Sequence, residues 1–249
     1  MKLLFSLLIM MTIAFNCCKS FSLANNKIDY SKFENKVNQQ QCFTSSGSYP
    51  SGYSSSYVSL SFNGNYPTSN GGVQQLSFLE SGYIDIDFVG GQLFVNFLLD
   101  EGNTKTKGNL WAFSGNSTQY VSVNVNETDY CFQQPLIFSV PSFNGLKYVT
   151  DFELGTVQCD MFEQNNVEGN FTNQVLLVDK SDCSLLSGTT QNINSPSGYT
   201  MTNFYYYTPA ADQEFFQLPS ICLNPPQSTK SKLNSLLAKL PKIIQNLPF

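Results

Sequence analysis

The sequence predicts an all-β protein, built either as one strongly curved antiparallel sheet or as a sandwich. Short segments in which apolar and polar residues alternate fill most of the chain, and clusters of Gly, Pro, Asn and Ser separate them. Alternation with period two is typical of strands that bury one face, and such clusters are typical of turns. A helical pattern is confined to the last residues, and neither an internal repeat nor a linker divides the body.

The first predicted strand covers residues 57–62. Val58, Leu60 and Phe62 share one face of it, and Asn63-Gly64 follows as a turn signal. The clearest hairpin then joins residues 83–89 to residues 92–99 through Gly90 and Gly91. Paired glycines favour a two-residue turn, which fixes the pairing of the two strands.

This turn places six apolar side chains on one face, in the pairs Phe88 with Leu93, Ile86 with Val95 and Ile84 with Phe97. Further strands are predicted at 120–125, 148–154, 157–161, 175–177 and 200–207. The last of these places Thr202, Phe204 and Tyr206 on one face. The apolar residues of the hairpin, with Phe204 and Tyr206, are the candidate lining of a ligand pocket, and ordinary sheet packing is the alternative.

The two ends of the chain differ from this body. Lys2 precedes an uncharged apolar run from Leu3 to Phe15, which is typical of a signal peptide. Cleavage is expected after Ala24, or after Ser20, and a retained anchor is the alternative. The sequence therefore predicts a signal peptide over 1–24, a β domain over 25–224 and a tail over 225–249.

The tail is basic and amphipathic. Its apolar residues recur at helical spacing, and its charged residues are all lysines: Leu233, Leu236, Leu237, Leu240, Ile243, Ile244 and Leu247, with Lys230, Lys232, Lys239 and Lys242. Pro241 should kink or end this helix. The tail is expected to pack on the body, to fray, or to lie on an anionic membrane surface.

Composition excludes several classes of function. The chain has no histidine, which removes Ser-His and Cys-His nucleophiles and the usual zinc sites. A sequence pI of about 4.7 argues against nucleic-acid binding. Three sequons, at Asn116, Asn126 and Asn170, predict glycosylation of a secreted chain.

Five cysteines remain after the predicted signal, so one has no partner within the chain. Cys159 lies mid-strand on the same face as Val157 and Met161, which indicates a buried free thiol. The other four lie at strand ends or in loops, where bridges are usual, and the sequence alone allows three pairings of Cys42, Cys131, Cys183 and Cys222.

Three segments resemble the ependymins and the mammalian ependymin-related proteins. They are the strand-then-cysteine segment 175–183, the closing segment 215–222 with its Pro-Ser-x-Cys motif, and the stretch from Tyr120 to Cys131. The resemblance implies a half-barrel similar to the bacterial LolA type, with a curved sheet around an apolar pocket. It also implies bridges from Cys42 to Cys183 and from Cys131 to Cys222. A third bridge that relatives often carry has no match here, and Cys159 has no clear counterpart.

Asp85 and Asp87 are the best pair of acids for chemistry, because residues i and i+2 project from one strand face about 7 Å apart. That separation suits an inverting glycosidase, yet such neighbours usually face water. Calcium is a candidate cofactor for clustered carboxylates. Asp179, Lys180 and Asp182 surround Cys183, and we interpret them as structural.

We therefore expect a secreted or endolysosomal glycoprotein, not an enzyme, that binds a hydrophobic ligand, above all a lipid, in a β-sheet pocket. The competing hypotheses are a calcium-dependent adhesion or extracellular matrix protein and a carboxylate-based hydrolase. A homodimer and an anionic membrane surface are further candidate partners, and nucleic acid is not expected.

Overall fold

The computed structural model describes residues 42–43, 50–67, 72–125, 128–136, 146–164, 172–193 and 196–225. All of them belong to the second of two compact units, Met1–Asn35 and Lys36–Phe249. The predicted signal peptide, the tail beyond Pro225, and the sequons at Asn126 and Asn170 lie outside the described residues.

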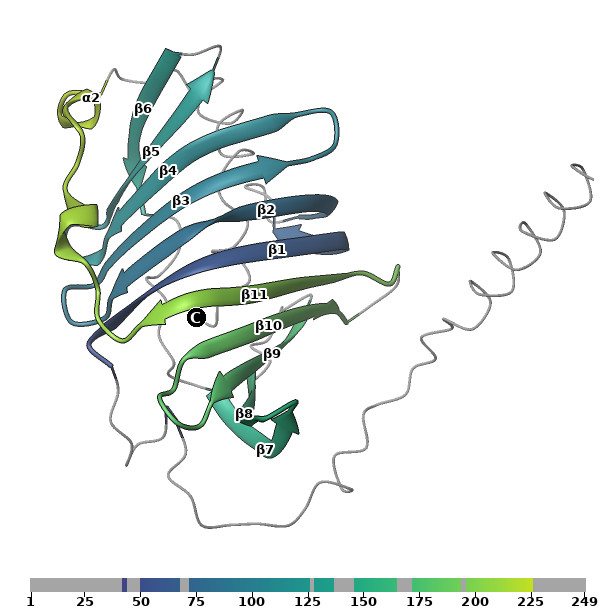
Figure 1. The fold of residues 1–249 in the computed structure, drawn as a ribbon. Helices are drawn as coiled ribbons and strands as arrows, with labels where there is room; N and C mark the ends of the chain where they lie inside the picture. Colours follow the sequence, from purple (N-terminus) through teal and green to yellow (C-terminus); the bar gives the residue numbers. More distant parts are fainter. Residues whose placement is uncertain are drawn as a thin grey trace, which may run out of the picture. The chain divides into compact units, whose positions relative to one another are not determined.

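The described residues form one antiparallel sheet of eleven strands (Figure 1). The strands are β1 Gly52–Pro67, β2 Val73–Asp87, β3 Gln92–Asp100, β4 Lys105–Phe113, β5 Thr118–Val125, β6 Thr128–Pro135, β7 Leu146–Leu154, β8 Val157–Gln164, β9 Thr172–Asp179, β10 Leu185–Asn192 and β11 Tyr199–Thr208. Three short helical segments accompany them: η2 Ser114–Asn116, η3 Gln213–Phe216 and α2 Ser220–Leu223. The prediction of a single curved antiparallel sheet is confirmed, and the sandwich alternative was wrong.

The strand order is β6-β5-β4-β3-β2-β1-β11-β10-β9-β8-β7. Two meanders, β1 to β6 and β7 to β11, therefore meet where β1 pairs with β11 at the centre of the sheet. Figure 1 shows the strands twisting progressively from β6 to the curled β7 and β8. We call the face that carries Ile84, Val95 and Phe204 the inner face, and the face that carries Phe94 and Trp111 the outer face.

The β2–β3 hairpin corrects the predicted register. Ile86 pairs with Leu93 and Ile84 with Val95, so the pairing lies two residues from the prediction. The turn has four residues rather than two, because the Asp87 carboxylate accepts hydrogen bonds from the backbone N–H groups of Val89 and Gly90. A slip of two residues leaves every side chain on its predicted face.

The predicted turn at Asn63-Gly64 is a bulge instead. β1 continues through it to Pro67, with a register shift between Ser61 and Gly64 and Asn63 at a φ of 49°. The strand keeps pairing with β2 on both sides of the bulge. The long β1 can therefore serve as the central strand of the sheet.

Candidate functional site

An apolar block on the inner face is the candidate site. Its side chains come from alternate positions along β2, β3, β4 and β5, and each is between 0% and 3% exposed: Ile84, Ile86, Leu93, Val95, Phe97, Leu99, Leu110, Ala112, Val121 and Val123. The strand pairings align them in rows, for example Ile84, Val95, Leu110 and Val121. Burial of each such aliphatic or aromatic side chain contributes about 1.5–3 kcal/mol.

Phe97 occupies the middle of this block because its neighbours across the sheet are glycines. It pairs with Gly82 on β2 and Gly108 on β4. A Cβ at position 108 would meet the Phe97 ring at 2.8 Å. Glycine at this position therefore lets the ring lie over the neighbouring strand.

Buried hydroxyl groups lie between the aromatic side chains on the inner face of β1 and β11. Ser59 Oγ and Thr202 Oγ1 lie 2.7 Å apart, and Thr200 Oγ1 donates to Ser61 Oγ at 2.9 Å. Beside them the Tyr57 hydroxyl donates to Glu80 Oε1 at 2.8 Å. Burial, with the adjacent Glu80 carboxylate, raises the pKa of Tyr57 well above its usual value. The inner face thus combines an apolar block with a polar ladder at the centre of the sheet.

The far end of the apolar block is also polar. Gln119 and Gln134 lie opposite each other on β5 and the edge strand β6. Both are buried, and Gln134 Nε2 has no hydrogen-bond partner among the described residues. Because buried polar groups are usually hydrogen-bonded, the Gln134 amide is available to donate to a polar group that lies at this end of the block.

Most of the predicted pocket residues lie on the inner face, and Tyr206 does not. Ile84, Ile86, Leu93, Val95, Phe97 and Phe204 are all buried on the inner face, and Phe88 packs against their cluster from the turn. The prediction for Tyr206 was wrong, because this residue is 89% exposed. A bulge interrupts the alternation of β11 there, with Tyr206 at a φ of 57°.

The same bulge brings in a residue that the alternation assigned to the other face. Tyr207 packs against the inner cluster and stacks on Tyr53, with ring centroids 6.2 Å apart. Burial is the main reason that the pKa of Tyr207 is raised to about 12. No residue-type signal at 204–207 marks the position of the bulge.

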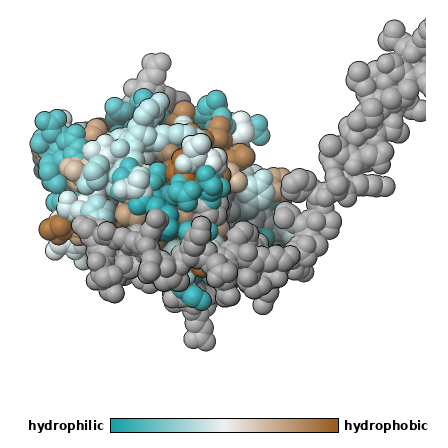
Figure 2. Space-filling model, turned by 60° about the horizontal axis from the view of Figure 1, so that its bottom comes forward, coloured by the Kyte–Doolittle hydropathy of each residue, from teal (hydrophilic) through white to brown (hydrophobic). Residues whose placement is uncertain are grey.

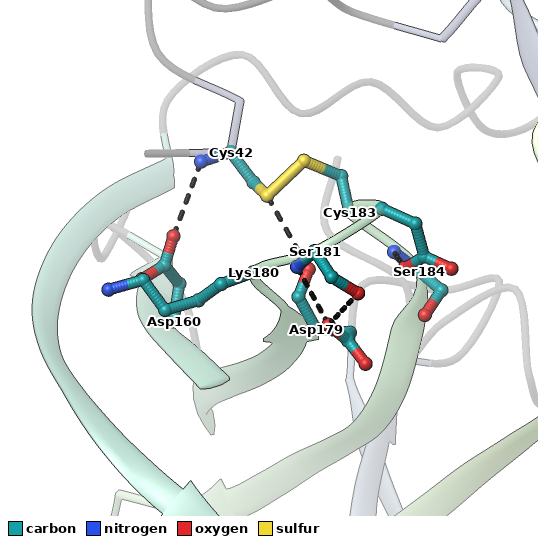
Figure 3. Close-up of a disulfide and its surroundings, with 8 residues drawn as sticks. Cys42, Asp160, Asp179, Lys180, Ser181, Cys183 and Ser184 are labelled. Carbon is teal, nitrogen blue, oxygen red and sulfur yellow. Dashed lines mark hydrogen bonds and ion pairs between the residues drawn. A yellow bond between two sulfur atoms is a disulfide. The ribbon is translucent and has the colours of Figure 1, made fainter. Parts of the chain in front are cut away.

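The disulfide from Cys42 to Cys183 is formed as the family resemblance implies. Figure 3 shows it beside a buried charge cluster. Asp160 is fully buried and accepts a hydrogen bond from the Cys42 backbone N–H, while Lys180 Nζ lies 3.5 Å from Asp160 and 3.4 Å from Asp151. Burial raises the pKa of Asp160, and the Cys42 N–H and Lys180 oppose that rise. These charged residues hold the first described segment against the sheet.

The second disulfide, from Cys131 to Cys222, is also formed. It fastens residues 209–225, which we call the clasp, to the outer face. The single tryptophan, Trp111, donates through Nε1 to the Phe215 carbonyl at 2.9 Å, and the Phe215 ring stacks on Phe94 at 5.2 Å. Phe216 and Cys222 are buried in the same outer cluster.

Asp85 and Asp87 bind the clasp. Asp85 is fully buried and accepts hydrogen bonds from Ser54 Oγ and from the Asp212 backbone N–H. Asp87 accepts from Gln213 Nε2 at 3.0 Å, besides ordering its own turn. Burial raises the pKa of Asp85, and the three donors, Ser54, Asp212 and Tyr83, oppose the rise. Both carboxylates are engaged in structure, which gives the glycosidase hypothesis no support.

A second set of apolar residues is exposed on the outer face. It runs across β11, β1, β2 and β3, beyond the area covered by the clasp, and comprises Met201, Tyr199, Val58, Leu60, Phe62, Leu79 and Leu98. Leu60 is 52% exposed and Phe62 57%. On the face drawn in Figure 2, apolar residues likewise reach the surface at several places among hydrophilic ones. The alternation in 57–62 therefore indicates two faces correctly, with the apolar face turned outward.

The remaining candidate features are the free cysteine, the sequon at Asn116, metal sites and membrane-spanning helices. Cys159 is free and fully buried, as predicted. Asn116 is exposed in η2. In the part of the chain that the structure describes, no group of three His, Cys, Asp or Glu side chains is placed to hold a metal ion. That part also contains no helix of the length and hydropathy needed to cross a membrane.

A surface pocket of about 420 Å³ lies at the β7–β8 turn, next to the end of β9. Its lining combines polar and charged residues with one valine: Thr156, Val157, Gln158, Asp179, Lys180 and Ser181. This pocket is separate from the apolar block.

Comparison with known proteins decides the family. The model of the ependymin domain of amoebozoa matches residues 40–244, which is most of the chain. The chain belongs to the ependymin family. The ependymin match begins just before Cys42 and extends well past the clasp, so it spans both disulfides and most of the tail. It indicates no enzyme class.

Individual relatives come from Dictyostelium discoideum. The chain is 29% identical over 221 residues to an uncharacterized protein of that organism. This match covers 87% of the present chain and 67% of the relative. It is also 41% identical over 76 residues to a protein named probable cytochrome P450 514A1, but this match covers 27% of the chain and 13% of that protein. So short a match does not place this ependymin among the cytochromes.

Among solved structures, the chain is similar to a domain described as an outer membrane lipoprotein-sorting protein from Vibrio parahaemolyticus. The TM-score is 0.33 and the sequence identity 10%, over 67% of this chain and 89% of that domain.

Proposed function

We propose that this ependymin binds a hydrophobic ligand, most simply a lipid, against the inner face of its sheet, and that it performs no covalent chemistry. The observation that carries the proposal is the apolar block, which spans four neighbouring strands and is bordered by polar groups at both ends. Ligand sites commonly combine such an apolar lining with a few polar groups that fix orientation.

The chemistry of the remaining residues supports a binding protein. The chain has no histidine, and its best carboxylate pair is engaged by the clasp. An amphiphile would place its chain over Leu93, Val95 and Leu110 and its head near the hydroxyl ladder or the glutamine pair. We further propose that the protein works as a glycoprotein in the secretory or endolysosomal lumen, where its two disulfides persist.

The test is ligand binding by protein from its own source. Native mass spectrometry should detect a bound lipid, and delipidated protein should take up a pyrene-labelled fatty acid. Val95→Phe should lower the affinity for this probe about tenfold, because the added volume intrudes into the apolar block. Lys107→Phe, on the exposed outer side of the neighbouring strand, is the matched control and should bind as the wild type does. Protein that carries no lipid and takes up none at acid and neutral pH would refute the proposal.

A further inference from the structure

The exposed apolar residues of the outer face form a strip that the clasp leaves uncovered. We call outer strip the seven side chains that share this face of β11, β1, β2 and β3 and are each between 37% and 57% exposed: Tyr199, Met201, Val58, Leu60, Phe62, Leu79 and Leu98. Together they expose on the order of 600 Å², the upper end of the apolar patches that monomers usually carry. Patches of this size commonly mark an interaction site.

Strand pairing makes the outer strip one continuous surface. Met201, Leu60 and Leu79 are direct neighbours in a row across three strands. Phe62 pairs with Tyr199, and their ring centroids lie 6.4 Å apart. The three strand spacings from β11 to β3 give a width of about 14 Å. Central strands of the sheet therefore hold the strip on a firm backbone.

The strip contains no charged residue, and a lysine lies at its border. Lys107 pairs with Leu98 across β3 and β4, and it makes no ion pair with a carboxylate among the described residues. The nearby Lys105 is instead bound to Asp100 at 3.1 Å. A lysine stem packs along apolar surface while its ammonium group reaches a polar acceptor. The strip therefore fits an apolar partner that carries an anionic acceptor at its edge.

We propose that the outer strip docks the protein on the phospholipid leaflet of a membrane. Leu60, Phe62 and Leu98 enter the boundary of the acyl chains, and the Lys107 ammonium group binds a lipid phosphate. Tyr199 lies at the β11 border, and tyrosine is favoured at membrane interfaces. Residues 42–225 contain sixteen Asp and Glu against four Lys, so the body favours a neutral leaflet over a strongly anionic one. The proposal is independent of the ligand site, which lies on the opposite face and is tested in solution without vesicles.

A second copy of the chain fits the strip less well. A stable interface buries about 800 Å² on each partner, which is more than the strip offers. A second strip would also bring no free carboxylate to Lys107, because Asp100, the acid next to the strip, is engaged by Lys105. A phospholipid leaflet supplies both the apolar chains and the phosphate.

The first experiment measures binding of delipidated full-length protein to phosphatidylcholine vesicles by flotation. Leu60→Asp/Leu98→Asp places two charges in the strip and should lower the partition coefficient by about tenfold or more. Thr156→Asp/Gln158→Asp adds the same two charges at exposed positions of the β7–β8 turn, and it should bind as the wild type does. Trp111 emission verifies that each variant is folded.

The lysine is tested in the same assay. Lys107→Gln should weaken vesicle binding about threefold to fivefold, because the phosphate loses its cationic partner. Lys147→Gln, at an exposed position of β7, is the matched control and should leave vesicle binding unchanged. Equal affinities of these two variants would contradict the role of Lys107.

The second experiment locates the strip in the leaflet. Brominated phosphatidylcholine should quench the emission of Leu98→Trp strongly and that of Lys147→Trp little. Wild-type protein gives the background, because Trp111 is buried under the clasp. Equal quenching at positions 98 and 147, or undiminished flotation of Leu60→Asp/Leu98→Asp, would overturn the proposal. A wild-type dimer in sedimentation that Leu60→Asp/Leu98→Asp abolishes would assign the strip to a second copy and likewise overturn it.

Discussion

Removal of the Cys131–Cys222 bridge should release the clasp before the sheet unfolds. The perturbation is Cys131→Ser/Cys222→Ser. Residues 209–225 are then held to the outer face by noncovalent contacts alone: the packing of η3 and α2 against Phe94 and Trp111, and the hydrogen bonds of Asp212 and Gln213 with Asp85 and Asp87. A segment of this length has too few contacts to stay ordered by itself when its covalent link is cut.

The size of the effect follows from the loop that the bridge closes. The two cysteines are separated by 91 residues. The chain-entropy model gives a loss of about 4.6 kcal/mol of unfolding free energy at 25 °C for such a loop. With a urea m value of about 3 kcal/mol/M, the unfolding midpoint should fall by about 1.5 M.

Trp111 makes the assay direct, because it is the only tryptophan and lies under the clasp. In the variant its emission should shift to longer wavelength at urea concentrations where circular dichroism still reports an intact sheet. Cys42→Ser/Cys183→Ser is the control, since that bridge lies away from Trp111 and closes a loop of 141 residues. An unchanged urea midpoint in the first variant, or an equal early shift of Trp111 in the control, would refute this reasoning.

Three further predictions concern single residues. Burial raises the pKa of Asp85 above the usual 3.8, so the folded state binds its proton more tightly and stability should fall as pH rises from 4 to 7. Asp85→Asn should flatten that fall in urea midpoints, and an unaltered profile would contradict the assignment. Leu93→Ala should cost about 2–5 kcal/mol in urea unfolding, whereas Leu60→Ser on the exposed strip should cost less than about 1 kcal/mol; similar costs would show that the two faces are misassigned. Gln134→Leu should raise the unfolding free energy by about 1–2 kcal/mol, because it removes a buried amide donor without a partner, and a loss of stability would argue that the amide is bonded.

The faces of the β2–β3 hairpin could be predicted from sequence even though its register could not. The side-chain period of a strand is two, so an error of two residues moves Ile84 from Phe97 to Val95 but keeps both on the inner face. The length of the turn could not be predicted from the sequence. Gly90-Gly91 favours a two-residue turn, whereas the hydrogen bonds from Val89 and Gly90 to the Asp87 carboxylate stabilise a turn of four residues. The residues of the apolar block were therefore predicted correctly, although the predicted turn and strand register were wrong.

The failures have a common physical origin in long-range or backbone effects. Asp85 looked like one of a pair of acids because its partner Asp212 lies 127 residues further along the chain. Tyr206 does not lie on the inner face, because its own backbone adopts a positive φ in a bulge of β11. A tyrosine in the sequence gives no indication of such a conformation. The exposure of Leu60 and burial of Ser59 show that alternation identifies faces without saying which one is inside.

The positions of the two disulfides favour a fixed scaffold with an adjustable interior. The Cys131–Cys222 bridge fastens the clasp to the outer face, and the Cys42–Cys183 bridge fastens the first described segment beside β8 and β9. Neither bridge crosses the apolar block of β2 to β5. Any layer on that block is therefore held by noncovalent contacts, and it can be exchanged for a ligand without reduction of a disulfide. Reducing agents should accordingly weaken the scaffold, while ligand exchange should proceed in fully oxidised protein.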